Sequence, residues 1–147
     1  MILGIIALVA MTLFAGGALH VTVSEHPARM SLPDQAKLLQ WKGSFTRALR
    51  MAPPLALLGL VFGLWAWWQT GNIFWMGGAL VAGINVPFTL LVIEPTNRRL
   101  LAMDDSQAGP ASSALIARWG RLHGIRTGLA LAATAIMAWA LLARAGT

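Results

Sequence analysis

Long apolar runs alternate with short polar stretches along the chain, and four runs are long enough to cross a membrane. The first extends from Met1 to Val23 without a charged side chain, and a helix of that length spans a hydrocarbon core of about 30 Å. It lacks the basic leading region of a secretory signal peptide, so we interpret it as a membrane span. The other predicted spans cover about residues 52–68, 73–93 and 112–143.

The breaks between these runs indicate how the spans are joined. A tight polar break at residues 69–72 follows the second run, which predicts a helical hairpin of spans two and three. We expect Pro87 to kink the third span, and we expect the span to stop at Glu94 and Pro95. The fourth is predicted to be one long helix whose first turns stand in the headgroup layer.

The connection over residues 24–51 carries a helical pattern of its own. Pro33 and Asp34 can start a helix, and an apolar stripe follows at Leu38, Leu39, Trp41, Phe45 and Leu49. We expect this helix to lie along the membrane interface or to cap the bundle, with a solvated loop as the alternative. The predicted fold is therefore all-α, a single transmembrane four-helix domain over residues 1–147 with an interfacial helix between spans one and two.

The composition agrees with an integral membrane protein. Apolar residues make up 57 % of the chain and charged residues 11 %, whereas soluble domains carry about 25 % charged residues. The mean hydropathy is +0.67. Cysteine is absent, which excludes structural disulfides, thiol redox chemistry and thiolate metal sites.

The distribution of charge predicts an orientation. Lys and Arg number eleven against five Asp and Glu, for a net charge of +6. Ten of the eleven lie in the two long connections or at the entry to the fourth span, and only Arg144 lies on the other side. The positive-inside rule therefore predicts cytoplasmic connections and both termini outside, as for a protein of a bacterial cytoplasmic membrane. The expected partners are the lipid bilayer, a lipophilic small molecule and a possible second copy of the chain, but not nucleic acid.

Rare polar residues near the predicted membrane are the candidates for chemistry, because burying them there is costly. Trp119, His123 and Arg126 share one face of the fourth helix. Glu25 and His26 end the first span before Pro27, which we expect to interrupt the helix. Glu25 is the expected anionic partner of Arg126.

Further polar candidates lie on the first and third spans or directly after the third. They are His20 on the first span, Asn85 and Thr89 on the third, and Thr96 and Asn97 just after it. The His and Arg candidates could instead be headgroup contacts, and Trp119 could be an interfacial anchor. A metal bound by His and Glu is an open alternative, but no compact ligand motif exists, so we assign no metal ligand and leave the cofactor unknown, or absent.

Four segments of the chain resemble a known family. They are Ser24-Glu25-His26-Pro27, Pro87-Phe88-Thr89, Pro95-Thr96-Asn97-Arg98-Arg99-Leu100, and the stretch from Trp119 through His123 to Arg126. Their order and spacing resemble the anthrone oxygenase-like family of small four-span membrane proteins. The resemblance covers nearly the whole chain, and it implies oxidation of an anthrone to an anthraquinone by dioxygen without an evident organic cofactor.

The resemblance leads to a hypothesis for the roles of these residues. We expect His123 to act as the general base, with Arg126 and Asn97 stabilising the developing oxyanion. Glu25 and His26 would orient groups or relay a proton. Trp119 would stack on a flat substrate. The remaining expected substrate-binding residues are Thr89, Thr96 and His20.

Two other classes of function stay open from the sequence. One is a small membrane transporter, although such proteins generally need a carboxylate within the membrane and the central parts of these spans have none. The other is a noncatalytic membrane subunit or assembly factor that packs through its Gly and Ala faces.

Overall fold

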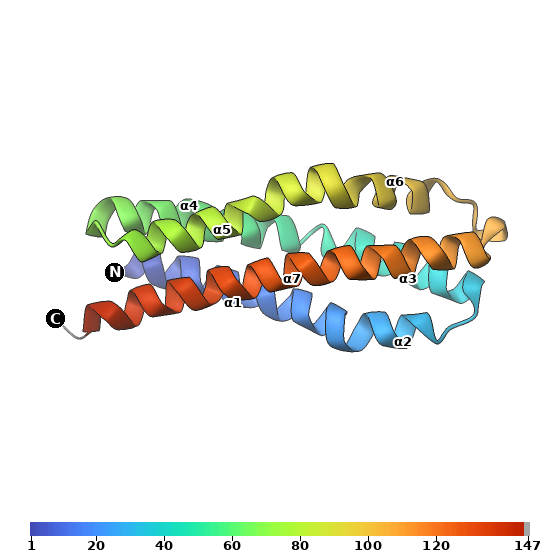
Figure 1. Cartoon of the computed structure of the whole chain (residues 1–147), viewed down its shortest axis with the longest axis horizontal. Coiled ribbons are helices and arrows are strands. Elements are labelled where there is room, and N and C mark those ends of the chain that lie inside the picture. Colours follow the sequence, from blue (N-terminus) through green and yellow to red (C-terminus); the bar gives the residue numbers. More distant parts are fainter. Residues whose placement is uncertain (146–147) are drawn as a thin grey trace.

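The computed structural model describes residues 1–145, and these residues form an elongated all-α bundle of four rods (Figure 1). Side chains are described as far as residue 143, so the expected isolated charge of Arg144 lies outside the described side chains. The elements are α1 (Ile2–His20), η1 (Val21–Glu25), α2 (His26–Met30), α3 (Asp34–Ala48), α4 (Ala52–Thr70), α5 (Ile73–Phe88), η2 (Thr89–Ile93), α6 (Glu94–Ala102), η3 (Asp105–Gln107) and α7 (Pro110–Ala145).

Each rod is long and apolar enough to cross a membrane. In chain order, the first to fourth rods are Ile2–Met30, Asp34–Thr70, Ile73–Ala102 and Pro110–Ala143. The two chain ends and the α4–α5 turn lie at one end of the bundle, and the α2–α3 and α6–α7 connections lie at the other (Figure 1). An integral membrane protein with four helices is the architecture that these features indicate.

The first and third rods each contain a short π-helical segment followed by a proline. The segments η1 and η2 precede Pro27 and Pro95, and the amide after each segment bonds to the carbonyl five positions earlier. A wider turn of this kind makes room for a proline ring, which has no amide hydrogen to donate. The expected helix ends at Pro27 and at Glu94–Pro95 are therefore wrong, because both helices continue past these prolines.

The predicted hairpin of the second and third rods is held by a Gly-Asn turn. Gly71 ends α4 in the left-handed conformation at φ 67°, where glycine carries no steric penalty. Asn72 then caps α5 by accepting a hydrogen bond from the Phe74 amide at 3.0 Å. Its Nδ2 also donates to the Ala140 carbonyl at 3.1 Å, which ties the hairpin to α7.

Small residues allow the helices to approach closely in the half of the bundle that holds the chain ends. A Cβ at Gly59 would overlap the Met11 side chain, and a Cβ at Gly78 would lie 2.6 Å from Met137 Cγ. The core there consists of Ala, Met and a few aromatic side chains. Glycine and alanine at these contacts let the helix backbones pack closely.

The helix expected between spans one and two is α3, and it packs against the opposite half of the bundle. Its side chains Leu38 and Trp41 are fully buried in a second cluster with Leu100 and Ile116. Lys42 Nζ also donates to the Met103 carbonyl at 2.6 Å. Since α3 contacts α2, α6 and α7, it covers one end of the bundle.

Candidate functional site

A cavity of about 360 Å³ borders both hydrophobic clusters near the α3–α4 turn. Most of its wall is apolar, with Phe14 and Ala18 from α1 and Phe45, Leu49 and Leu55 from the second rod. The third rod contributes the polar residues Asn85, Thr89, Glu94 and Asn97, and the fourth contributes His123 and Arg126. Arg29 and Ser44 add polar groups from the first and second rods.

The predicted face of the fourth helix lines this cavity. Trp119 and His123 are 7 % and 4 % exposed, and their ring centroids are 4.7 Å apart. Arg126 is partly buried, and its Cζ lies 5.5 Å from the centre of the Phe14 ring. Arg118 and Arg121 are exposed and point elsewhere, as expected.

Hydrogen bonds to His123 determine which ring nitrogen carries the proton. Arg126 Nη2 lies 3.2 Å from His123 Nε2. A guanidinium can only donate, so Nε2 must accept and the ring proton is on Nδ1. His123 Nδ1, which carries this proton, lies 3.1 Å from Thr22 Oγ1 and 3.4 Å from Thr127 Oγ1. The imidazole is therefore neutral, and its lone pair is directed toward Arg126.

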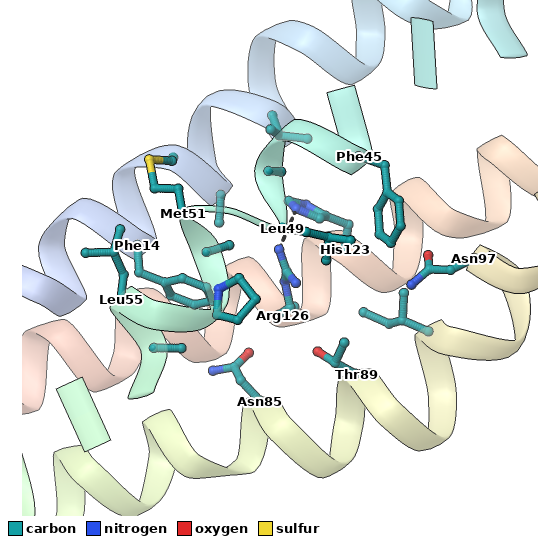
Figure 2. A pocket seen from close by; sticks show the side chains of 18 of the residues that line it. Phe14, Phe45, Leu49, Met51, Leu55, Asn85, Thr89, Asn97, His123 and Arg126 are labelled. Atoms are coloured by element: carbon teal, nitrogen blue, oxygen red, sulfur yellow. Dashed lines mark hydrogen bonds between the residues drawn. The ribbon is translucent and has the colours of Figure 1, made fainter. Parts of the chain in front are cut away.

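The third rod presents a second row of polar side chains to the same space. Figure 2 shows Asn85 and Thr89 pointing across the cavity toward Arg126 and His123. Asn97 Nδ2 donates to Glu94 at 3.0 Å. Its buried Oδ1 has no hydrogen-bond partner among the described residues. Asn97 therefore offers the cavity a free acceptor, and its amide nitrogen has a second N–H beyond the one that bonds to Glu94.

The expected pairing of Glu25 with Arg126 is wrong. Glu25 Oε1 instead accepts from Arg29 Nη2 at 2.6 Å, Ser44 Oγ at 2.5 Å and Gln40 Nε2 at 2.9 Å. Arg29 Nε also donates to Gln40 Oε1. Since Pro27 does not end the helix, Glu25 on η1 and Arg29 on α2 stand one turn apart. The bonds of this pair to Gln40 and Ser44 join the first rod to α3.

Arg29 is the functional candidate that the sequence reasoning missed. It is 2 % exposed, it lines the cavity, and its Cζ lies 5.5 Å from the centre of the Trp119 ring. The four-residue spacing between Glu25 and Arg29 predicts an ion pair on one helix face. The expected helix break at Pro27 hid this pairing, because it separates the two residues.

Besides Glu25, three predicted site residues do not line the cavity. His26 lies behind the wall, with its ring centroid 6.0 Å from that of Trp119 and its imidazole against Gly120. Thr96 is buried but directed elsewhere. His20 is exposed on the outside of α1, where it cannot contribute to the cavity.

The described residues do not fit a metal centre. Among residues 1–143, no three His, Asp or Glu side chains converge so that they could hold one ion. Glu25 is already engaged by three donors and His123 by Arg126.

A comparison with protein-family models identifies the relationship. The anthrone oxygenase model matches residues 41–136, a stretch that holds the whole polar face of α7 and all the lining residues of the third rod. The chain belongs to the anthrone oxygenase family. Searches of curated proteins and of solved structures find no match to it. Membership of the anthrone oxygenase family indicates an oxygenase-like function.

Proposed function

We propose that the protein is a membrane oxygenase that uses dioxygen to convert a flat, lipophilic, anthrone-like substrate into a quinone. One observation carries the proposal: two rows of polar side chains, on the third rod and on α7, face each other across a cavity whose remaining wall is mostly apolar. Such a cavity suits a fused aromatic ring system with oxygen atoms at its edges. The family relationship supplies the reaction class.

The chemistry begins with the acidic methylene carbon of the substrate. His123 Nε2 accepts one methylene proton, and the resulting enolate transfers one electron to dioxygen to give a radical and superoxide. These recombine through a new carbon–oxygen bond, and the protonated His123 returns its proton to the peroxide. Loss of the second methylene hydrogen as a proton, with cleavage of the O–O bond, gives the quinone carbonyl and water. One dioxygen is consumed for each anthrone.

Arg126 must leave His123 Nε2 for this base to act, because it occupies the lone pair at 3.2 Å. We infer that the guanidinium turns from His123 to the negative charge that forms on the reduced oxygen, which both frees the base and stabilises the anion. The rings of Trp119 and Phe45 line the cavity, and they offer apolar faces on which the substrate can stack.

The substrate is proposed to enter from the bilayer. Several side chains line the cavity and are also exposed on the outside of the bundle: Leu49 at 51 %, Met51 at 53 %, Val86 at 47 % and Leu90 at 62 %. We infer that they surround an opening between the second and third rods. Since these residues are apolar, the opening suits a molecule dissolved in lipid better than one in water.

The bundle end that holds α2, α3 and α6 is proposed to face the cytoplasm. Arg47, Arg50, Arg98, Arg99 and Arg118 are exposed at this end, where they can meet anionic headgroups. In this orientation α3 stands at the headgroup level, and the cavity lies just inside the hydrocarbon. Both termini are then outside.

Oxygen uptake by purified protein in lipid nanodiscs, with anthrone as substrate, tests the proposal. We expect one dioxygen per anthraquinone formed, above the spontaneous rate without protein. His123→Ala should reduce the rate at least about a hundredfold if general-base catalysis has its usual size. Arg121→Ala, an exposed change on the same helix, is the matched control and should retain full activity. No uptake above background, or an unchanged rate in His123→Ala, would refute this function.

A further inference from the structure

Asn85 carries a buried amide whose hydrogen-bonding atoms have no partner among the described residues. Its side chain is 3 % exposed, and neither Oδ1 nor Nδ2 finds a hydrogen bond among the described residues. The residue lies on α5, within the cavity wall, with its amide directed into the open space (Figure 2). It is therefore a polar group that belongs to the cavity and not to the packing between helices.

An amide in this position is costly to the free protein. Burying such a group without hydrogen bonds is unfavourable, and within a bilayer there is little water to compensate. The neighbouring cavity residue Val86 shows that this part of the helix accepts an aliphatic side chain. A bound molecule that satisfies both amide atoms offsets the cost, which gives Asn85 a role in recognition.

The position of Asn85 relative to His123 limits what it can bind. The two residues lie on different rods, and the cavity separates them (Figure 2). In an anthrone, the reacting methylene and the carbonyl stand at opposite edges of the middle ring. When the methylene faces His123, the carbonyl is directed away from α7 toward the third rod.

We propose that Asn85 is the specificity-determining residue that binds the carbonyl edge of the substrate: Nδ2 donates to the carbonyl oxygen and Oδ1 accepts from a hydroxyl beside it. This inference rests on the proposed function. Removal of the methylene proton places negative charge on that carbonyl oxygen, so the Nδ2 hydrogen bond strengthens as the enolate forms. Arg126, which is hydrogen-bonded to His123, is on the wrong edge for this contact.

Thr89 extends the same subsite. It follows Asn85 by four residues and lines the cavity beside it. The Thr89 hydroxyl forms no hydrogen bond with another described residue. By contrast, the Thr127 hydroxyl donates to the His123 carbonyl at 3.0 Å. A substrate with hydroxyls next to its carbonyl therefore meets an amide and a hydroxyl on one wall. The subsite selects for oxygen substituents on that edge.

Binding of two ligands of similar shape tests the inference without turnover. Anthraquinone carries carbonyls at both edges of its middle ring, and anthracene carries none. Quenching of tryptophan fluorescence reports binding, because Trp41 and Trp119 line the cavity. Asn85→Leu is compared with wild-type protein and with Val86→Leu, which alters the same wall without removing a polar atom.

We expect Asn85→Leu to weaken anthraquinone binding about tenfold. Anthracene binding should change by less than about twofold, and Val86→Leu should affect the two ligands equally. The variant should unfold at the same temperature as wild type or above it, since it replaces an unpartnered amide. Equal effects of Asn85→Leu on both ligands, or no effect on anthraquinone, would overturn the inference.

Turnover with anthrone separates this inference from the proposed function. If the protein oxidises anthrone, Asn85→Leu should lower kcat about a hundredfold, as loss of an oxyanion donor does. If the protein discriminates between the two ligands through Asn85 but does not consume oxygen, the subsite stands and the oxygenase proposal fails. If the protein consumes oxygen and Asn85→Leu does not change the rate, the oxygenase proposal stands and the Asn85 subsite fails.

Discussion

Breaking the buried ion pair between Glu25 and Arg29 should destabilise the protein, and by unequal amounts from the two sides. Side chains of Arg29 and Glu25 are 1 % and 23 % exposed, and their nearest atoms are 2.6 Å apart. Without Arg29, the Glu25 carboxylate keeps the donors Gln40 and Ser44. Without Glu25, Arg29 keeps only the Gln40 amide oxygen as acceptor.

The size of the effect follows from this difference. Removing one partner of a buried pair costs about 3–5 kcal/mol. Glu25→Leu should fall at the upper end, because it leaves a fully buried cation with one neutral acceptor. Arg29→Leu should cost about 3 kcal/mol or less, because the carboxylate is still bonded and partly exposed. The double variant should recover about 2 kcal/mol relative to the sum of the two single changes.

Equilibrium unfolding in detergent micelles, followed by tryptophan fluorescence, measures these free energies. Arg98→Leu provides a matched control, since Arg98 pairs with Glu94 at the same four-residue spacing but is 78 % exposed. It should change stability by no more than about 0.5 kcal/mol. Additive single changes, or an Arg29→Leu effect as small as that of Arg98→Leu, would refute the reasoning.

Two further predictions concern packing and access. Gly120→Ala should lower stability by about 1–3 kcal/mol, because the new methyl group would overlap the His26 ring and push it from the Trp119 side of the site. Gly124→Ala on the same helix meets no atom within 4 Å and should stabilise by up to about 1 kcal/mol; thermal unfolding distinguishes them, and equal effects would contradict the prediction. Leu90→Trp at the lateral opening should slow anthraquinone association about tenfold in stopped-flow fluorescence if this opening is the entry route. Leu80→Trp, an exposed position away from the cavity, should not, and equal rates in the two variants would exclude that route.

The helices and the polar face of α7 could be predicted because both depend on local periodicity. Four uninterrupted apolar runs imply four helices, and spacings of four and three residues place Trp119, His123 and Arg126 on one side of a helix. The same rule correctly separates Arg118 from that set, since it is exposed.

The errors arose where local rules meet tertiary context. A proline normally ends a helix, but the π-helical turns before Pro27 and Pro95 accommodate the proline ring. Because the helix continues past Pro27, Glu25 reaches Arg29 one turn later. The docking of α3 depends on contacts between residues far apart in the chain, such as Lys42 with Asp105 at 2.7 Å. A periodic pattern within one segment cannot predict a contact between residues so far apart in the sequence.

A structure of the protein with bound anthraquinone tests the central claim most directly. Flat ligand density should fill the cavity between α7 and the third rod, with one carbonyl edge within hydrogen-bonding distance of Asn85 Nδ2 and the other edge facing His123. The Arg126 guanidinium should have moved away from His123 Nε2. A cavity closed by aliphatic side chains, with the ligand bound only on the outside of the bundle, would contradict the account.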